Sequence, residues 1–290
     1  MRILVTGAGG MTGKAIIKAL QPQNVEIRAM VHRDSQREEI ISVGATEAVV
    51  GDVLNPDDVR RAVAGVDKIY HICNVANPQE DVIGHIVIDE VRRQQVVHFV
   101  YHSVLHALLS GMLHHKRKQA VEKYLVDSGM AYTILQPAAL MQNLRTGFDI
   151  LKHKGIFPQK FFVTDRTRMN LVSLDDVAEI AAKVLTGTGH EYATYEICGP
   201  QNLSLADMLS SMESVLHCPI TPQFIPDEMF AGRLREAGKL EEVIQTLLTM
   251  FRHYNERGFM GNAQSATILL GRVPVSLNEF LMNELILSNK

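Results

Sequence analysis

Short apolar segments alternate with amphipathic segments along the first half of the chain. Apolar runs that end in turn residues are typical of strands buried on both faces of a sheet. They predict strands over residues 2–8, 25–33, 46–52, 67–73, 96–103 and 131–137. Apolar residues at helical spacing predict helices over residues 11–20, 35–43, 56–64 and 114–128. This alternation predicts a parallel sheet covered by helices on both faces.

From about residue 144 onward the helical pattern dominates. Capping serines begin helices at SLDD (173–176), SLAD (204–207) and SLNE (276–279), and the last of these matches the capping box. A further strand is predicted at YEICGP (195–200). We therefore expect an α/β fold, a Rossmann-type doubly wound parallel sheet, over residues 1–143 and completed by later strands. A smaller, mainly helical C-terminal part over residues 144–290 would bind substrate or a partner.

The composition excludes several classes of protein. Hydrophobic residues make up 46% of the 290 residues, charged residues 21%, and the formal net charge is -3, as in an ordinary globular protein. Direct nucleic-acid binding is not expected, because it needs clustered positive charge. No apolar run approaches the ~18 residues of a membrane span. The three scattered cysteines favour a reducing compartment, and the first strand leaves no room for a leader, so we expect a cytoplasmic location.

The segment TGAGGMTG (6–13) carries the strongest chemical signal, because it lies between a predicted strand and a predicted helix. Gly7 permits the tight turn, Gly10 lets the backbone approach a pyrophosphate, and Gly13 allows the helix to pack on the strand. The first helical residues, Met11 and Thr12, add N–H groups and the positive end of the helix dipole. The alternative is a glycine-rich turn that holds no ligand.

The residue that reads the adenosine ribose is expected about 20 positions later, at the end of the second strand. Arg33 occupies this place and favours a 2′-phosphate through its charge and forked donors, whereas Asp34 is placed to cap the next helix. We therefore expect NADP as the cofactor, with NAD still possible. The alternative for Arg33 is a solvated charge at a strand end.

Several motifs together resemble a known family. TGxxGxxG at the start, GDV (51–53), a serine that ends the fifth strand and a lysine in the next helix resemble an extended or atypical short-chain dehydrogenase/reductase. HSVLH (102–106), the following HHKRKQAVEKYLVDSGMAYTILQPAALMQN and LLGRVPVSLNEFL (269–281) resemble its NmrA-like branch. That branch includes cytosolic quinone reductases and redox-sensing regulators.

The resemblance implies a site. Asp52 and Val53 match the segment that holds the adenine, although aspartate is also a common strand terminator. Asn74 matches the place where the backbone passes the cofactor ribose. Ser103 matches the family serine, and Lys118 matches the lysine that binds the nicotinamide ribose hydroxyls. The segment from Pro137 to Asn143 matches the residues beside the nicotinamide and the substrate.

The chain departs from the family at the proton donor. Carbonyl-reducing short-chain dehydrogenases use Tyr-x-x-x-Lys, and here His114 stands four residues before Lys118. The two side chains share a helix face, and imidazole titrates near neutral pH as a general acid should. His115, Lys116 and Arg117 indicate a partly solvated helix start, where a histidine is typically structural. Both readings of His114 stay open.

Four histidines fall within residues 102–118, and a metal site is the alternative reading of this cluster. His102 and His106 have an i,i+4 spacing, which suits metal ligands on a helix. The topology places Ser103 at a strand end, so the two rings would not share a helix face, and no acidic or thiol ligand accompanies them. We therefore expect no metal site.

Two functions remain. The first is an NAD(P)H-dependent oxidoreductase that reduces a small quinone-like or carbonyl substrate without a catalytic tyrosine, since hydride transfer is chemistry of the cofactor. The second is a non-catalytic NmrA-like regulator that senses NADP(H) and acts through protein partners. A homodimer is compatible with either function.

Overall fold

The computed structural model describes residues 1–160 and 166–286. The chain divides into two compact units that interleave along the sequence. The first unit comprises Met1–Pro137 and Val177–Tyr195, and the second comprises Ala138–Asp176 and Glu196–Lys290. The segment Val177–Tyr195 thus belongs to the first unit although it follows part of the second unit in the sequence. The boundary expected between residues 143 and 144 stays a prediction.

The first unit is built on a seven-stranded sheet with the order β10-β6-β5-β4-β1-β2-β3. Its strands are β1 (Arg2–Val5), β2 (Glu26–Val31), β3 (Glu47–Val50), β4 (Lys68–His71), β5 (His98–His102), β6 (Tyr132–Pro137) and β10 (Ala193–Ile197). The pairs β1–β2, β1–β4, β2–β3, β4–β5 and β5–β6 are all parallel. The carboxyl ends of β1, β4, β5 and β6 therefore meet at one edge of the sheet.

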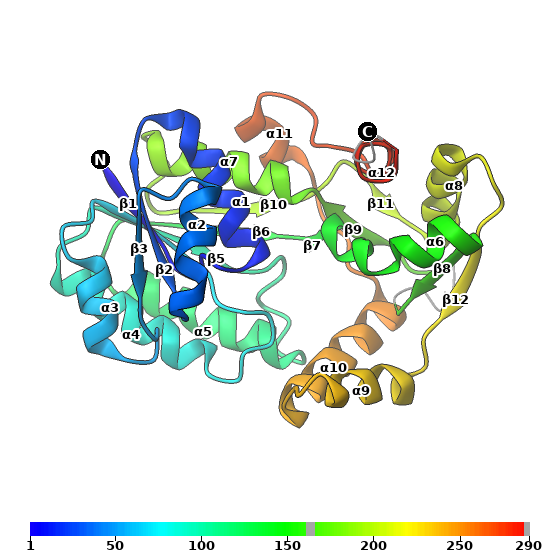
Figure 1. Cartoon of the computed structure of the whole chain (residues 1–290), viewed down its shortest axis with the longest axis horizontal. Coiled ribbons are helices and arrows are strands. Elements are labelled where there is room, and N and C mark those ends of the chain that lie inside the picture. Colours follow the sequence, from blue (N-terminus) through cyan, green and yellow to red (C-terminus); the bar gives the residue numbers. More distant parts are fainter. Residues whose placement is uncertain (161–165, 287–290) are drawn as a thin grey trace. The chain divides into compact units, whose positions relative to one another are not determined.

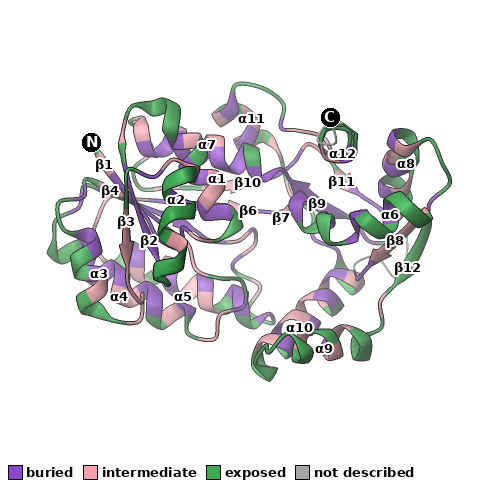
Figure 2. Ribbon diagram, viewed as in Figure 1, coloured by how far each residue is buried: buried purple, intermediate pink, exposed green. Residues whose placement is uncertain are grey.

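Helices cover this sheet. They are α1 (Met11–Leu20), α2 (Arg37–Val43), α3 (Pro56–Val63), α4 (Glu80–Arg93) and α5 (Leu113–Asp127), with most of α7 (Leu174–Thr186) and the short 3-10 helices η1 (Gln21–Gln23) and η2 (Asp34–Gln36). Helices α3, α4 and α5 lie side by side, and α1 and α2 lie against each other (Figure 1). A core that includes Leu4, Ile69, Val87, Phe99 and Val121 packs the sheet against α3, α4 and α5. Figure 2 shows the central strands buried and the outer helix faces exposed.

The second unit is mainly helical. Its helices are η3 (Met141–Gly147), α6 (Phe148–Lys154), α8 (Leu205–Leu216), α9 (Asp227–Glu236), α10 (Glu241–Arg257), α11 (Gln264–Leu270) and α12 (Leu277–Leu285). Its strands form two small sheets: β11 (Asn202–Leu203), β9 (Met169–Val172) and β7 (Ala139–Leu140) in one, and β12 (Thr221–Phe224) with β8 (Ile156–Gln159) in the other. Ser204 and Ser276 form capping boxes at α8 and α12, where the sequence places helix starts.

The predicted Rossmann-type fold is confirmed, with two local corrections. No helix is predicted between residues 74 and 95, whereas the structure has α4 there. The expected capping role of Asp34 is wrong, because Asp34 already lies in the first turn of η2 and pairs with Arg37 at 2.7 Å. The Gln36 side chain accepts the Arg33 N–H at 3.0 Å instead. Over residues 1–160 and 166–286, every helix is too short or too polar to cross a membrane.

Candidate functional site

The glycine turn between β1 and α1 adopts the geometry that its sequence predicts. Gly7 has a φ of +59°, in the left-handed region that favours glycine, and a Cβ there would lie 2.8 Å from the Ile72 carbonyl oxygen. A Cβ on Gly13 would lie 2.5 Å from the Gly7 carbonyl oxygen and 2.6 Å from the Ala8 Cα. Larger residues would force the helix away from the strand.

The N-terminus of α1 fits a phosphate group. Gly10 is its N-cap residue, with extended backbone, and over the described part of the chain no side chain caps this helix. The first-turn N–H groups and the helix dipole thus favour an anion at this end. Met11 is exposed and Thr12 is buried at this start. The cradle formed by Gly7, Gly10 and Gly13 fits the pyrophosphate of a dinucleotide.

The residues expected at the adenosine end follow β2, β3 and β4. Arg33 is exposed two residues beyond β2, and Asn74 is exposed three residues beyond β4. Asp52 closes its own turn, because its Oδ1 accepts the Leu54 N–H at 2.9 Å. Val53 packs against the core of the first unit. Asp52 therefore has a structural function whether or not it also meets the adenine.

Ser103 is buried directly after β5, and its hydroxyl donates to the Glu122 carboxylate on α5. The Gln136 side chain donates to the same carboxylate oxygen at 2.9 Å. Burial raises the pKa of Glu122, while these hydrogen bonds oppose the shift. Glu122 is not among the predicted site residues, although its position four residues after Lys118 places it on the same helix face.

Lys118 lies in a buried polar cluster at the carboxyl ends of β4 and β5. Its ammonium donates to Glu80 Oε1 at 2.6 Å and to the His102 carbonyl oxygen at 3.2 Å. The Tyr101 hydroxyl donates to the same Glu80 oxygen at 3.1 Å. Burial, and then the Glu80 charge, raise the pKa of Tyr101 well above its usual value, so the phenol stays protonated.

Glu80 is not among the predicted site residues, because no helix is predicted over the segment that begins at Glu80. The acidic pair Glu80–Asp81 was an available signal for a helix start, since acidic residues are enriched in the first turn of a helix.

The start of α5 is partly solvated, as expected, because Leu113 and Lys116 are exposed. His114, however, is only 3% exposed, and His115 is fully buried. Burial, followed by the charges of His115 and Lys118, lowers the pKa of His114 to about 3. The ring is therefore neutral at pH 7, and the catalytic role of His114 stays a prediction. Its Nδ1 has no hydrogen-bond partner among the described residues. A neutral imidazole can still donate an N–H to a substrate oxygen.

The remaining histidines of this segment have local partners. His102 ends β5, and its Nδ1 lies 2.6 Å from the Tyr70 hydroxyl. His106 lies beyond the strand with a φ of +56°, and its carbonyl oxygen lies 2.9 Å from His115 Nδ1. His102 and His106 therefore do not share a helix. Across the described residues, no three His, Cys, Asp or Glu side chains come together as metal ligands.

Two predicted residues fall on either side of the division between the units. Pro137 ends β6, and its carbonyl oxygen accepts the Leu105 N–H at 2.9 Å, which ties the segment after β5 to the end of β6. Asn143 is an exposed residue of η3 in the second unit. Its contribution to the site stays a prediction.

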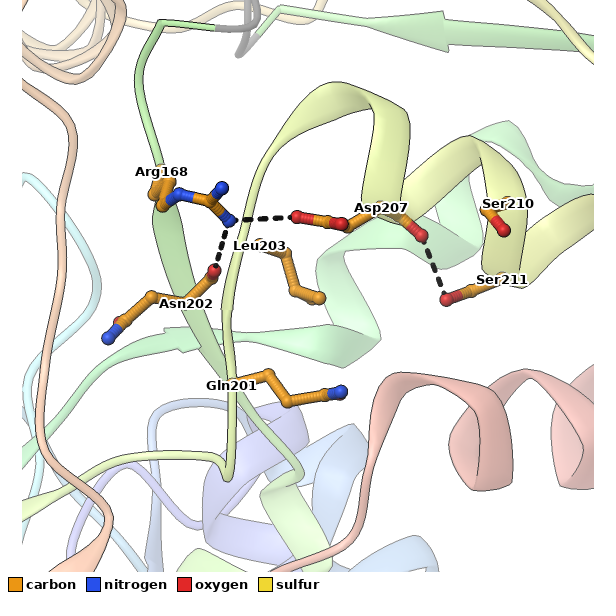
Figure 3. Close-up of a pocket in the computed structure, with 7 residues that line it drawn as sticks. All are labelled: Arg168, Gln201, Asn202, Leu203, Asp207, Ser210 and Ser211. Atoms are coloured by element: carbon orange, nitrogen blue, oxygen red, sulfur yellow. Dashed lines mark hydrogen bonds and ion pairs between the residues drawn. The ribbon is translucent and has the colours of Figure 1, made fainter.

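The second unit has a polar hollow at the start of α8 (Figure 3). Arg168 donates to Asp207 at 3.0 Å and to the Asn202 carbonyl oxygen at 3.2 Å. Ser204 and Asp207 together cap α8. The charges and helix-end groups of this hollow therefore satisfy one another, and it contains none of the predicted site residues.

A comparison with protein families identifies the first unit's chemistry. The model of a family described as NAD(P)H-binding matches residues 7–188, which include the glycine turn, Ser103 and Lys118. The chain belongs to this NAD(P)H-binding family. The expected cofactor class, a nicotinamide dinucleotide, is thereby confirmed.

Several of the proteins that this chain resembles are reductases. The NAD(P)H azoreductase of Xenophilus azovorans is 27% identical over 219 residues, 75% of each chain. Quinone oxidoreductase 2 of Escherichia coli is 24% identical over 282 residues, 96% of each chain. The solved NADPH complex of the quinone oxidoreductase QOR2 from Escherichia coli has a TM-score of 0.82 at 23% identity, covering 96% of this chain and 98% of its own. At that identity the structural likeness shows the shared fold.

The glycine turn gives a test that separates folding from cofactor binding. We expect Gly13→Ala to lower the free energy of unfolding by about 2 kcal/mol, because its Cβ would overlap backbone atoms. Gly10→Ala places the Cβ 3.3 Å from the Gly7 carbonyl oxygen, a tight contact but a milder one, so stability should decrease less than in Gly13→Ala. Both variants should lose at least about tenfold in NADPH affinity, measured by fluorescence titration. A Gly10→Ala protein with unchanged affinity would contradict this placement of the pyrophosphate.

The buried histidines predict how stability depends on pH. The pKa values of His71, His102 and His114 fall from 6.5 to about 3 in the folded protein, in each case chiefly because of burial. Below pH 6.5 these histidines bind protons in the unfolded chain but stay neutral in the folded protein. The free energy of unfolding should therefore be highest above pH 6.5 and decrease as the pH falls toward 3.

Urea unfolding at a series of pH values measures this dependence, and His114→Asn is the matched variant. Removing one such histidine should reduce the slope by about 1.4 kcal/mol per pH unit between pH 4 and 6, because one proton fewer is taken up on unfolding. An unchanged slope would show that His114 is protonated in the folded protein.

Proposed function

We propose that this chain is an NADPH-dependent reductase of a quinone-like acceptor. One observation carries the proposal: the glycine turn and the buried Lys118 lie at the carboxyl edge of one parallel sheet, and the place of the proton-donating tyrosine holds a neutral histidine. In open α/β sheets, ligands bind outside the carboxyl ends of the strands. The arrangement favours a reaction that needs hydride orientation more than a strong acid.

The residues present fit NADPH along this edge. The cradle of Gly7, Gly10 and Gly13 would hold the pyrophosphate, and Arg33 would meet the 2′-phosphate. Lys118 would donate to the nicotinamide ribose hydroxyls. When bound, the nicotinamide supplies the hydride, and the chain contributes orientation and shielding from water.

A quinone suits the missing tyrosine. Its ring accepts a hydride, and the charge that reaches its oxygens is delocalised, so a hydrogen-bond donor and one proton from solvent complete the hydroquinone. The neutral His114 can offer such an N–H without changing its own charge. A simple ketone would instead develop a localised alkoxide, for which a poised acid matters more.

The relatives support an acceptor of this kind. Two of the relatives are named for azo compounds and for quinones, two acceptors whose reducible bonds lie in conjugated systems. We infer that a small molecule of this type is the partner of the site. The comparisons give no support to the alternative, a non-catalytic regulator.

Turnover tests the proposal. Purified protein should oxidise NADPH in the presence of simple benzoquinones or naphthoquinones and form one hydroquinone per NADPH. Lys118→Met should lower kcat/KM by at least about tenfold, because an interaction with the cofactor ribose is lost. Lys123→Ala is the control, since Lys123 is an exposed lysine of the same helix. Tight NADPH binding with no oxidation by quinones, azo dyes or aldehydes would overturn the proposal in favour of the regulator.

Cofactor choice has its own test at Arg33. Arg33→Ala should weaken NADPH binding about tenfold and leave NADH binding nearly unchanged, because an exposed arginine contributes on the order of 1 kcal/mol to a phosphate contact. NADPH and NADH are each titrated into Arg33→Ala, wild type and the control variant Lys123→Ala, and the affinities are compared. Equal losses for NADPH and NADH would refute the assignment of Arg33 to the 2′-phosphate.

A further inference from the structure

Lys118 is paired with Glu80, which faces it from a neighbouring helix of the first unit. Glu80 is fully buried and Lys118 is 5% exposed. The two charged groups are 2.6 Å apart, and they form an ion pair between the first residue of α4 and the second turn of α5. The buried ammonium requires a counter-charge, because burying an unpaired charge is energetically costly.

A glycine brings the two helices together at this place. A Cβ on Gly84 would lie 2.5 Å and 2.6 Å from the two methyl groups of Val121, so α4 and α5 approach more closely than a side chain there would allow. Glu80 lies one turn before Gly84, and Lys118 lies nearly one turn before Val121. The close contact therefore sets the distance between carboxylate and ammonium.

Tyr101 also contacts the Lys118 ammonium and its carboxylate partner. Its ring centroid lies 5.4 Å from Lys118 Nζ, and its hydroxyl donates to the same carboxylate oxygen that accepts from the lysine. Lys118 also donates to the carbonyl oxygen of His102, the residue before Ser103. The ammonium is thus fixed beside the strand end that carries the family serine.

Other titratable groups near Lys118 do not replace Glu80. His71 and His102 are neutral at pH 7, because burial and the Lys118 charge lower their pKa values to about 3. Burial raises the pKa of Cys73 to about 12, so its thiol is neutral as well. Glu122 lies one turn further along α5 and receives hydrogen bonds from Ser103 and Gln136.

The two oxygens of the Glu80 carboxylate differ in their contacts. Oε1 accepts hydrogen bonds from Lys118 and Tyr101, whereas Oε2 is buried and has no hydrogen-bond partner among the described residues. A buried acceptor without a partner is unfavourable. The carboxylate is therefore placed to meet the lysine rather than to satisfy both of its own oxygens.

We infer that Glu80 is the positioning residue of Lys118, holding the ammonium where it meets the nicotinamide ribose of NADPH. This inference rests on the proposed function, because that function gives Lys118 its contact with the cofactor. It assigns to Glu80 control over one end of the cofactor. The adenosine end, held by the glycine cradle and Arg33, is independent of Glu80.

Two ligands separate the two ends in a binding experiment. NADPH contains the nicotinamide ribose, whereas 2′,5′-ADP contains the adenosine end without it. We expect Glu80→Gln to weaken NADPH binding about tenfold, because an amide keeps the shape of the side chain but removes its charge. The affinity for 2′,5′-ADP should stay within about twofold of wild type. Glu80→Asp, which retains the charge with a shorter reach, should recover part of the NADPH affinity.

Glu90→Gln is the matched control. Glu90 lies on the same helix, is 1% exposed and pairs with Arg60 at 3.0 Å, at the opposite end of α4 from Glu80. The Glu90→Gln protein should be less stable than wild type, with an unchanged ratio of its affinities for NADPH and 2′,5′-ADP.

Three outcomes would count against the inference or the proposed function in distinguishable ways. Unchanged NADPH affinity in a folded Glu80→Gln protein would overturn the inference, while turnover by wild type would keep the proposed function. Parallel losses for NADPH and 2′,5′-ADP would also overturn it, because they would mark Glu80 as a residue of folding. Wild-type protein that binds NADPH and never oxidises it would defeat the proposed function alone.

Discussion

The contact between the β1–α1 turn and the first turn of α1 is the constraint on which the candidate site depends. Gly13 sits so close to the Gly7 and Ala8 backbone that any Cβ would collide with it. This contact directs the N-terminus of α1 toward the carboxyl edge of the sheet, where a helix end favours phosphate. The parallel register then brings the ends of β4 and β5 to the same edge. Cofactor binding follows from this packing.

Buried polar groups form the second feature of the site. Glu80, Tyr101 and Lys118 share one carboxylate oxygen, and Ser103 is bonded to Glu122. Because burial discourages charge on isolated groups, the neighbouring histidines are neutral while the lysine and Glu80 stabilise each other as an ion pair. The site therefore offers a fixed cation and neutral hydrogen-bond donors, which is what an orienting reductase needs.

Much of the fold could be predicted from the sequence, because its signals are local. The apolar runs of the strands, the spacing of the three glycines and the serine caps before α8 and α12 each depend on a few neighbouring residues. Helix α4 was not predicted, although its acidic first turn is a local signal, and Glu80 was missed with it. The ion pair itself joins residues 38 positions apart and depends on helix packing, which local signals do not show. The burial of His114 was missed for the same reason. Its polar neighbours in the sequence indicate solvent, whereas its neighbours in space exclude it.

A crystal structure of the NADPH complex would show directly where the cofactor binds. We expect the pyrophosphate against the N–H groups of the first turn of α1 and the 2′-phosphate within hydrogen-bond reach of Arg33. A nicotinamide ribose hydroxyl should contact Lys118, with Glu80 still paired to the lysine. A dinucleotide bound elsewhere on the chain, or one whose nicotinamide ribose lies away from Lys118, would contradict this placement of NADPH.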